Sequence, residues 1–301
     1  MDPEWITGLC DRSANFSIIV YSRKEGKWEI RPVFELLIHI RYKEVVDKMN
    51  KYFKIGSVYK VGNKLTYRVN KFSDLNEVIV PHFKKYPLIS TKIVAFKLWL
   101  KILELMNKDL HKSERGLMEI LSLYASIGRG PSKKVMKHFP SLKPAIKPEY
   151  SFSSIQLSEY WISGYLSIYC NFQVNTDPHG FKESYYNRVV PSFNFSRKKE
   201  ELILMELLSS YFSVTPNIRS NGLRIDVNVY SLDKLRTVVD LFTSFPLSTP
   251  KQKEFNVWSE IANKLIFISS IPSHRISLDY YMPLFLNLVK ELNVIRNLNN
   301  K

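Results

Sequence analysis

The sequence predicts an α+β fold made of two pseudo-symmetric halves, each with the element order αββαββα. The first observation is a repeat, because Trp5 to Phe16 (WITGLCDRSANF) recurs in altered form from Trp161 to Phe172 (WISGYLSIYCNF), at an offset of 161 − 5 = 156. The second is that later motifs recur at almost the same offset. The third is that hydrophobic residues switch between the period of a strand and that of a helix in the same order in both halves.

Three pairs of later motifs carry the second observation. Tyr211-Phe212 repeats Tyr52-Phe53 at 211 − 52 = 159, and the FTSFPL motif at Phe242 repeats FKKYPL at Phe83 at 242 − 83 = 159. The NGLRIDVN motif beginning at Asn221 matches NKLTYRVN at Asn63, at 221 − 63 = 158. A nearly constant offset over three anchors argues against chance similarity and predicts a duplicated domain.

In the first half, the repeated helix is followed by two predicted strands, Phe16–Ser22 and Trp28–Arg41, joined by a charged turn. Alternation in the second strand predicts one buried face and one at least partly solvent-exposed face. The predicted buried face has Ile30, Phe34, Leu36, Ile38 and Ile40, and the other face has Glu29, Arg31, Val33 and Glu35.

The rest of that half continues with a helix, a hairpin and further helices. Lys43–Phe53 has the hydrophobic spacing of an amphipathic helix. The strands Ser57–Val61 and Lys64–Asn70 then form a hairpin turned by Gly62-Asn63. Three helices follow, at Ser73–Phe83, Ile93–Met106 and Ser113–Ser126, the last with Ser113 as its N-cap.

Both copies of the repeat resemble the signature helix of the LAGLIDADG family of homing endonucleases and intron maturases. The connecting segments Ile38-His-Ile-Arg, Pro191-Ser-Phe-Asn-Phe and Ala125-Ser-Ile-Gly-Arg-Gly are also similar to those of the family, so the resemblance covers nearly the whole chain. It implies a monomer whose halves pack through the signature helices, which approach closely at Gly8 and Gly164. It also implies a saddle-shaped antiparallel sheet surface that lines a nucleic-acid groove.

The chain departs from the family at the metal-binding positions. In the family the late acid of each signature helix holds a divalent metal, and alignment on Gly8 and Gly164 places these positions at Ser13 and Tyr169. Hard cations such as Mg²⁺ need carboxylate and other oxygen ligands, and neither residue is a carboxylate. We therefore expect a fold that has lost its nuclease activity: not an enzyme, with no metal site and no cofactor.

Composition favours a nucleic-acid partner. The formal charge is 44 − 28 = +16 and the sequence pI is about 9.6, which suits a polyanion. No apolar stretch is long enough to span a bilayer, and the first motif follows too closely on Met1 for a presequence in the chain as given. Cys10 and Cys170 are expected to be buried packing residues.

Candidate nucleic-acid-binding residues lie on the predicted solvent-exposed strand faces and in a basic linker. We expect an N-terminal half (residues 1–127), a basic linker (128–150) and a C-terminal half (151–301). The basic candidates of the strands are Arg31, Lys64, Arg68, Arg188 and Arg224, with the polar candidates Thr66, Asn70, Asn194 and Asn228 between them. The linker contributes Arg129, Lys133 and Lys134 as contacts to phosphates, which position nucleic acid without reading its sequence.

These observations favour an inactive RNA-binding protein that serves as a structural component of a mitochondrial ribosome or related ribonucleoprotein. RNA is favoured over duplex DNA as the partner, other ribonucleoprotein subunits are possible partners, and no membrane partner is expected. Two alternatives remain: a maturase that assists splicing of a group I intron, and a site-specific homing DNA endonuclease. The expected location is the mitochondrial matrix.

Overall fold

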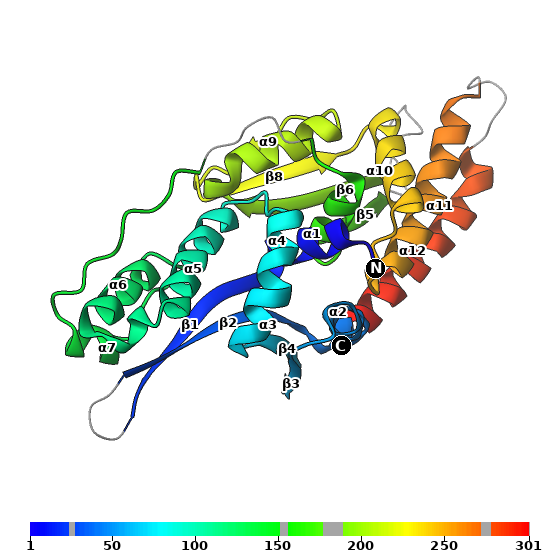
Figure 1. The fold of residues 1–301 in the computed structure, drawn as a ribbon. Coiled ribbons are helices and arrows are strands. Elements are labelled where there is room, and N and C mark those ends of the chain that lie inside the picture. Colours follow the sequence, from blue (N-terminus) through cyan, green and yellow to red (C-terminus); the bar gives the residue numbers. More distant parts are fainter. Residues whose placement is uncertain (24–27, 151–155, 177–188, 272–277, 301) are drawn as a thin grey trace. The chain divides into compact units, whose positions relative to one another are not determined.

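The structure is a computed structural model that describes residues 1–23, 28–150, 156–176, 189–271 and 278–300. The chain divides into two compact units, Met1–Gln156 and Leu157–Lys301. Figure 1 shows the elements of each unit.

The first unit begins with the signature helix and its sheet and continues with helices. Its elements are α1 (Pro3–Ser13), β1 (Ala14–Ser22), β2 (Trp28–His39), η2 (Ile40–Tyr42), α2 (Lys43–Phe53), β3 (Ser57–Val61), β4 (Lys64–Val69), α3 (Phe72–Asp74), η3 (Leu75–Ile79), α4 (Val80–Lys85), α5 (Lys92–Asn107), η4 (Leu110–Lys112), α6 (Glu114–Ala125) and α7 (Lys133–His138).

The second unit repeats this order with longer final helices. Its elements are α8 (Glu159–Leu166), β5 (Cys170–Thr176), β6 (Val189–Lys198), η6 (Lys199–Glu201), α9 (Leu202–Tyr211), β7 (Asn217–Ile218), β8 (Arg224–Val229), α10 (Leu232–Ser244), α11 (Lys251–Ser269) and α12 (Leu278–Asn300).

Each unit contains one four-stranded antiparallel sheet with the same connectivity. The strand orders are β1-β2-β4-β3 and β5-β6-β8-β7. The alternation expected in the hairpin is present, since Leu65, Tyr67 and Val69 are buried whereas Lys64 is exposed. The α+β class with two pseudo-symmetric halves is therefore confirmed.

The buried face of each sheet packs on an aromatic cluster that recurs in both units. Phe16 and Phe34 have ring centroids 5.4 Å apart, and the equivalent Phe172 and Phe193 are also 5.4 Å apart. The indole N–H of Trp99 on α5 donates to the carbonyl of Ser17 at 3.0 Å. That of Trp258 on α11 donates to the carbonyl of Gln173 at 3.1 Å. Each of these two helices is therefore attached to the first strand of its sheet by a buried tryptophan.

The two signature helices differ in length. In α1, Asp2 caps the N-terminus by accepting from the backbone N–H of Glu4, and the helix continues to Ser13. In α8 the helix ends at Leu166, because the hydroxyl and backbone N–H of Ser167 both donate to the carbonyl of Gly164 and tighten the last turn. Tyr169 consequently lies after the helix, immediately before β5.

Residues 128–150, expected to be an exposed linker, fall within the first unit and contain α7. Val135 and Leu142 are buried against Leu121 of α6. The Trp28 ring packs on Phe139, with centroids 5.3 Å apart. Apolar side chains hold this segment against the first unit, although its basic residues remain exposed. None of the described helices has the length and hydropathy that would let it cross a membrane.

Candidate nucleic-acid interface

The outer face of the first sheet carries a charged pair that spans two strands. Register places Asn15 of β1, Glu35 of β2 and Arg68 of β4 side by side. Arg68 donates from Nη2 and Nε to Oε2 of Glu35 at 2.9 and 3.2 Å. Its guanidinium also lies 5.7 Å from the ring centre of Tyr59 on β3. These contacts hold Arg68 in one orientation on a face that is open to solvent.

A second polar group lies at the far end of β1 and β2. Arg31 donates to the hydroxyl of Tyr21 at 3.0 Å, and that hydroxyl donates to Glu29, which also pairs with Arg23. The hydrogen bond from Tyr21, supported by Arg23, lowers the pKa of the Glu29 carboxyl. Arg31 is therefore oriented by the tyrosine and leaves most of its N–H donors available.

The remaining candidates of the first unit lie on or just beyond β4. Lys64 and Thr66 lie on the outer face, opposite His39 and Leu37 of β2. Asn70 is exposed and follows directly after the strand. Lys64 and Thr66 therefore lie on the strand face that was expected from the sequence. Contact of Lys64, Thr66 and Asn70 with nucleic acid stays a prediction.

The second sheet presents amides where the first presents a charged pair. Asn171 of β5, Asn194 of β6 and Asn228 of β8 lie opposite one another across three strands. Arg224 at the start of β8 donates to the hydroxyl of Ser196 at 2.6 Å. Arg188 lies outside the described residues. Asn171 and Gln173 were not among the predicted site residues, although alternation in Cys170–Thr176 places both side chains on the outer face.

The basic residues of the segment after α6 are exposed. Arg129 lies between α6 and α7, and Lys133 and Lys134 form the first turn of α7. Lys134 donates from Nζ to the hydroxyl of Ser22 at the end of β1, at 3.2 Å. This contact places Lys134 beside the sheet that carries the other candidates of the first unit.

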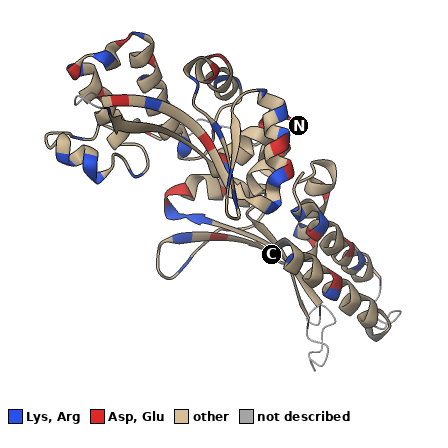
Figure 2. Ribbon diagram, turned by 90° about the horizontal axis from the view of Figure 1, so that it is seen from below, with Lys and Arg blue, Asp and Glu red and all other residues tan. Residues whose placement is uncertain are grey.

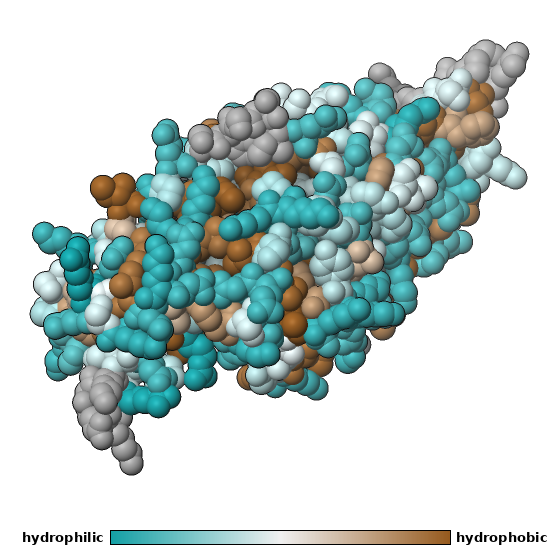
Figure 3. Space-filling model, in the orientation of Figure 1, coloured by the Kyte–Doolittle hydropathy of each residue, from teal (hydrophilic) through white to brown (hydrophobic). Residues whose placement is uncertain are grey.

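Charged residues of both signs are spread over the strands and helices. Figure 2 shows blue and red positions on strands of both sheets. On the face shown in Figure 3, hydrophilic residues are widely distributed and not gathered in one patch. The positive net charge favours attraction to a polyanion. Because positive and negative side chains are interspersed, individual side chains of the protein still determine which groups of the polyanion are contacted.

Asp11, the carboxylate nearest to Ser13 in α1, is held by hydrogen bonds in the interior of the first unit. It is fully buried and accepts hydrogen bonds from the backbone N–H groups of Ile89 and Ser90 at 2.6 and 3.0 Å and from the Ser90 hydroxyl. Burial raises the pKa of Asp11, although these hydrogen bonds act against the rise. Both of its oxygens are occupied by the connection before α5, which makes Asp11 unsuitable as a metal ligand.

The residues at the family's metal-binding positions do not fit a divalent cation. The Ser13 hydroxyl is buried and has no hydrogen-bond partner among the described residues, and Tyr169 is 41% exposed. No cluster of three or more His, Cys, Asp or Glu that could hold a metal occurs in the described part of the chain. A neutral hydroxyl and a phenol lack the charge that such a cation requires, so no chemical step through a metal is derived. Gly8 and Gly164 are buried in α1 and α8, and their mutual approach stays a prediction.

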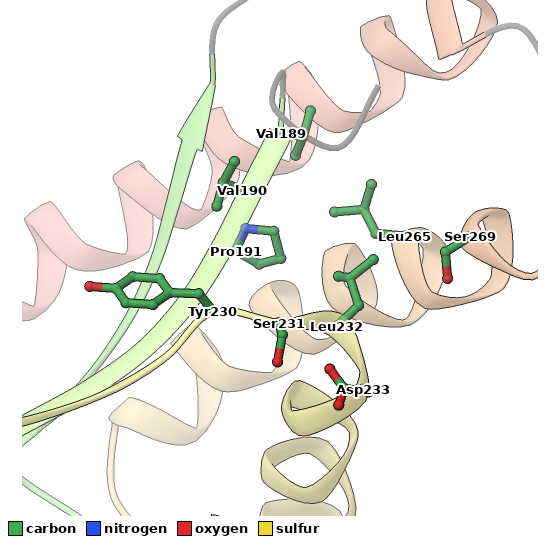
Figure 4. Close-up of a pocket in the computed structure, with 9 residues that line it drawn as sticks. All are labelled: Val189, Val190, Pro191, Tyr230, Ser231, Leu232, Asp233, Leu265 and Ser269. Carbon is green, nitrogen blue, oxygen red and sulfur yellow. The ribbon is translucent and has the colours of Figure 1, made fainter. Parts of the chain in front are cut away.

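A cavity in the second unit is not equipped for chemistry. It has a volume of about 340 Å³ and lies between the start of β6, the connection from β8 to α10, and α11. Figure 4 shows its mainly apolar lining, with Asp233 as the one charged residue drawn. A hydrogen bond from Ser231 lowers the pKa of Asp233. Apart from Asp233, the one titratable side chain among the described lining residues is the phenol of Tyr230, and the polar sheet faces remain the better candidate site.

Comparison with known proteins identifies relatives of both units. The model of the family described as "LAGLIDADG endonuclease" matches residues 6–103 and 162–262. "Probable intron-encoded endonuclease 3" of Neurospora crassa is 27% identical over 270 residues, covering 87% of this chain and 50% of that protein. "Probable intron-encoded DNA endonuclease 1" of Mycosarcoma maydis is 24% identical, covering 69% of this chain and 79% of that protein.

Solved structures match almost the entire chain. The homing endonuclease I-GzeII in complex with its DNA target superposes with a TM-score of 0.83 at 25% identity, covering 98% of this chain and 97% of that one. I-SmaMI bound to cleaved DNA superposes with a TM-score of 0.85 at 25% identity, covering 97% and 95%.

These comparisons contradict two expectations drawn from the sequence. The expectation that the chain is not an enzyme is wrong, because its relatives are named endonucleases. The preference for RNA over duplex DNA is also wrong, because the similar structures are complexes with DNA targets. The expectation of an inactive ribosomal component gave too much weight to Ser13 and Tyr169, and the endonuclease alternative is better supported.

Proposed function

The chain belongs to the LAGLIDADG endonuclease family, and from this premise we propose that it is a site-specific endonuclease that acts on duplex DNA. The observation that carries the proposal is the pair of equivalent four-stranded sheets with polar outer faces, in a fold that matches a DNA-bound homing endonuclease over 98% of the chain. Strands that lie in the major groove can contact base edges.

The charge and the oriented arginines support duplex DNA as the ligand. A net charge of +16 favours a dense polyanion. Arg68 is held by Glu35 through one edge of its guanidinium, so its remaining N–H groups can donate to base edges. Exposed lysines such as Lys133 are suited to phosphates and would position the duplex.

The cleavage step of this proposal is supported by the names of the relatives and not by a carboxylate pair at Ser13 and Tyr169. The chain spans about half the length of the first curated relatives that it matches, 50% and 48%. Activity and partners of the whole protein are therefore part of the proposal.

The genomic origin of the chain is a further part of the proposed function. The relatives include proteins named as intron-encoded and one named for an ND4 intron. These names support an origin in an organellar intron, and a mitochondrial location belongs to the proposal.

A selection from randomised duplexes tests both binding and cleavage. The chain is incubated with a random duplex library in Ca²⁺, bound duplexes are sequenced, and the enriched duplex is then incubated with Mg²⁺, Mn²⁺ or EDTA. We expect one enriched site and double-strand cleavage within it, and the EDTA sample measures whether that cleavage needs a divalent metal. Enrichment of no duplex would refute duplex recognition, and an enriched site left uncut in both metals would refute the endonuclease activity.

An arginine variant and a lysine variant of equal charge control for nonspecific attraction. Arg68→Ala is expected to weaken binding to the enriched site by about 5- to 150-fold, because a bidentate arginine contact to a base contributes about 1–3 kcal/mol of discrimination. Lys290 of α12 is exposed and belongs to neither sheet, so Lys290→Ala removes the same charge and is expected to change binding little.

A further inference from the structure

Four amide side chains lie together on the outer face of the second sheet. We name Asn171, Gln173, Asn194 and Asn228 the amide row. Asn171 donates from Nδ2 to Oδ1 of Asn194 at 3.1 Å, and Asn194 donates from Nδ2 to Oε1 of Gln173 at 3.2 Å. Asn228 of β8 lies directly opposite Asn194 in the strand register. The hydrogen bonds orient three of the amides before any ligand binds.

These bonds leave hydrogen-bonding capacity that points away from the core. A primary amide has two N–H donors and a carbonyl oxygen with two lone pairs. Asn171 uses one donor in the row, and Gln173 uses one lone pair. Both side chains are exposed, and those of Asn194 and Asn228 are half-buried. The row can therefore offer a donor and an acceptor together to a ligand at the sheet surface.

The equivalent positions of the first sheet have different chemistry. Asn15, Glu35 and Arg68 occupy the row that corresponds to Asn171, Asn194 and Asn228. The first row is charged, with a salt bridge of 2.9 Å, whereas the second is neutral. Strand β5 has no charged residue. Two halves with equal folds thus present unlike functional groups.

We propose that the amide row reads A·T base pairs in the half of the DNA target bound by the second unit. This inference rests on the proposed duplex-DNA function. It adds a prediction of which base pairs occur in the half of the target that the second unit binds. In the major groove, adenine presents the N7 acceptor beside the N6 amino donor, and an asparagine or glutamine amide pairs with both at once.

Other ligands fit the row less well. Guanine presents two acceptors, O6 and N7, which match the two donors of an arginine and would oppose the carbonyl of an amide. Phosphate is bound most strongly by cations, and the amide row carries no charge. The row therefore contributes to the choice of base more than to the overall affinity.

The test compares matched variants in the duplex selection. Wild type, Asn194→Ala and Asn228→Ala are each selected against the random library, together with Arg68→Ala at the equivalent position of the first unit. In the DNA site that the wild-type chain enriches, we expect adjacent A·T pairs in one half. Each asparagine variant should lower the preference at these positions about tenfold. Arg68→Ala should instead alter positions in the other half.

The salt dependence separates base reading from electrostatic attraction. Loss of a neutral amide should leave the slope of affinity against salt concentration unchanged, since that slope counts neutralised phosphates. Melting temperatures identify a variant that loses its base preference because it is misfolded. Asn194→Ala and Asn228→Ala test the proposal independently of each other.

The outcomes distinguish this inference from the proposed function. If wild type enriches no duplex, the duplex-DNA function itself fails. If a site is enriched but neither asparagine variant changes any position, or the positions that change are G·C pairs, the amide-row inference is refuted while the endonuclease proposal stands.

Discussion

The carboxylate of Asp11 lies 2.6 Å from the backbone nitrogen of Ile89, although the two residues are 78 positions apart. This hydrogen bond attaches α1 to the connection that precedes α5. In the second unit the corresponding attachment has the opposite polarity, because the hydroxyl of Thr249 donates to the backbone carbonyl of Ser167 at 2.8 Å. The two units form the same junction with a buried carboxyl group in one and a hydroxyl in the other.

Replacement of Asp11 should destabilise the first unit more than the matched change destabilises the second. Asp11→Ala leaves the N–H groups of Ile89 and Ser90 buried without an acceptor, at a cost of about 2–4 kcal/mol. Thr249→Ala removes one neutral hydrogen bond, worth about 1 kcal/mol. Calorimetric unfolding of both variants measures the difference, and equal melting of Asp11→Ala and wild type would contradict this account.

Stability should fall as the pH is lowered from neutral, because of His82. The ring is buried beside Thr7 and Tyr52, with contacts of 3.1 and 3.3 Å, and burial lowers its pKa from 6.5 to about 4. Below pH 6.5 the unfolded chain binds a proton that the folded chain does not bind until about pH 4. The free energy of unfolding therefore decreases by about 3 kcal/mol across this window.

Denaturation at a series of pH values checks this prediction, with His82→Gln as the control. Glutamine does not titrate, so the variant should be less stable than wild type at pH 7.5 but should lose less stability between pH 6.5 and 4. Parallel pH profiles for the two proteins would show that another group is responsible.

A carboxylate at the Ser13 position should make stability depend on Mg²⁺. The Ser13 hydroxyl is buried, so Ser13→Asp places a poorly solvated charge there and should cost about 2 kcal/mol or more in EDTA. Bound Mg²⁺ would offset this cost, because a ligand of the folded state raises its stability. Thermal melting at increasing Mg²⁺ concentrations measures the effect. Ser13→Asn is the neutral control, and an equal Mg²⁺ response in both variants would exclude a metal at this position.

Removal of Lys133 should weaken duplex binding equally for all sequences. Lys133 is exposed at the start of α7, where a phosphate contact would neutralise one charge. Lys133→Ala should reduce the slope of log affinity against log salt by about one. Titrations at several salt concentrations, with enriched and unrelated duplexes, give this slope. A loss confined to the enriched site would instead indicate that Lys133 reads bases.

Strand alternation and the repeat offset were sufficient to predict most elements of the fold. The hairpin residues Leu65, Tyr67 and Val69 face the core as their period of two indicates, since successive side chains of a strand point to opposite faces. Asn194 and Asn228 were placed on the outer face for the same reason. That Val135 and Leu142 anchor residues 128–150 could not be predicted from their spacing, because their partner Leu121 lies on another helix.

The sequence by itself determined the duplicated α+β fold and the absence of acids at Ser13 and Tyr169, both of which follow from the residues at given positions along the chain. Only the tertiary structure decided which side chains meet: Asp11 with Ile89, Glu35 with Arg68, and the members of the amide row with one another. The physical reason is strand register and long-range packing, which bring together residues whose separation in sequence carries no signal of contact.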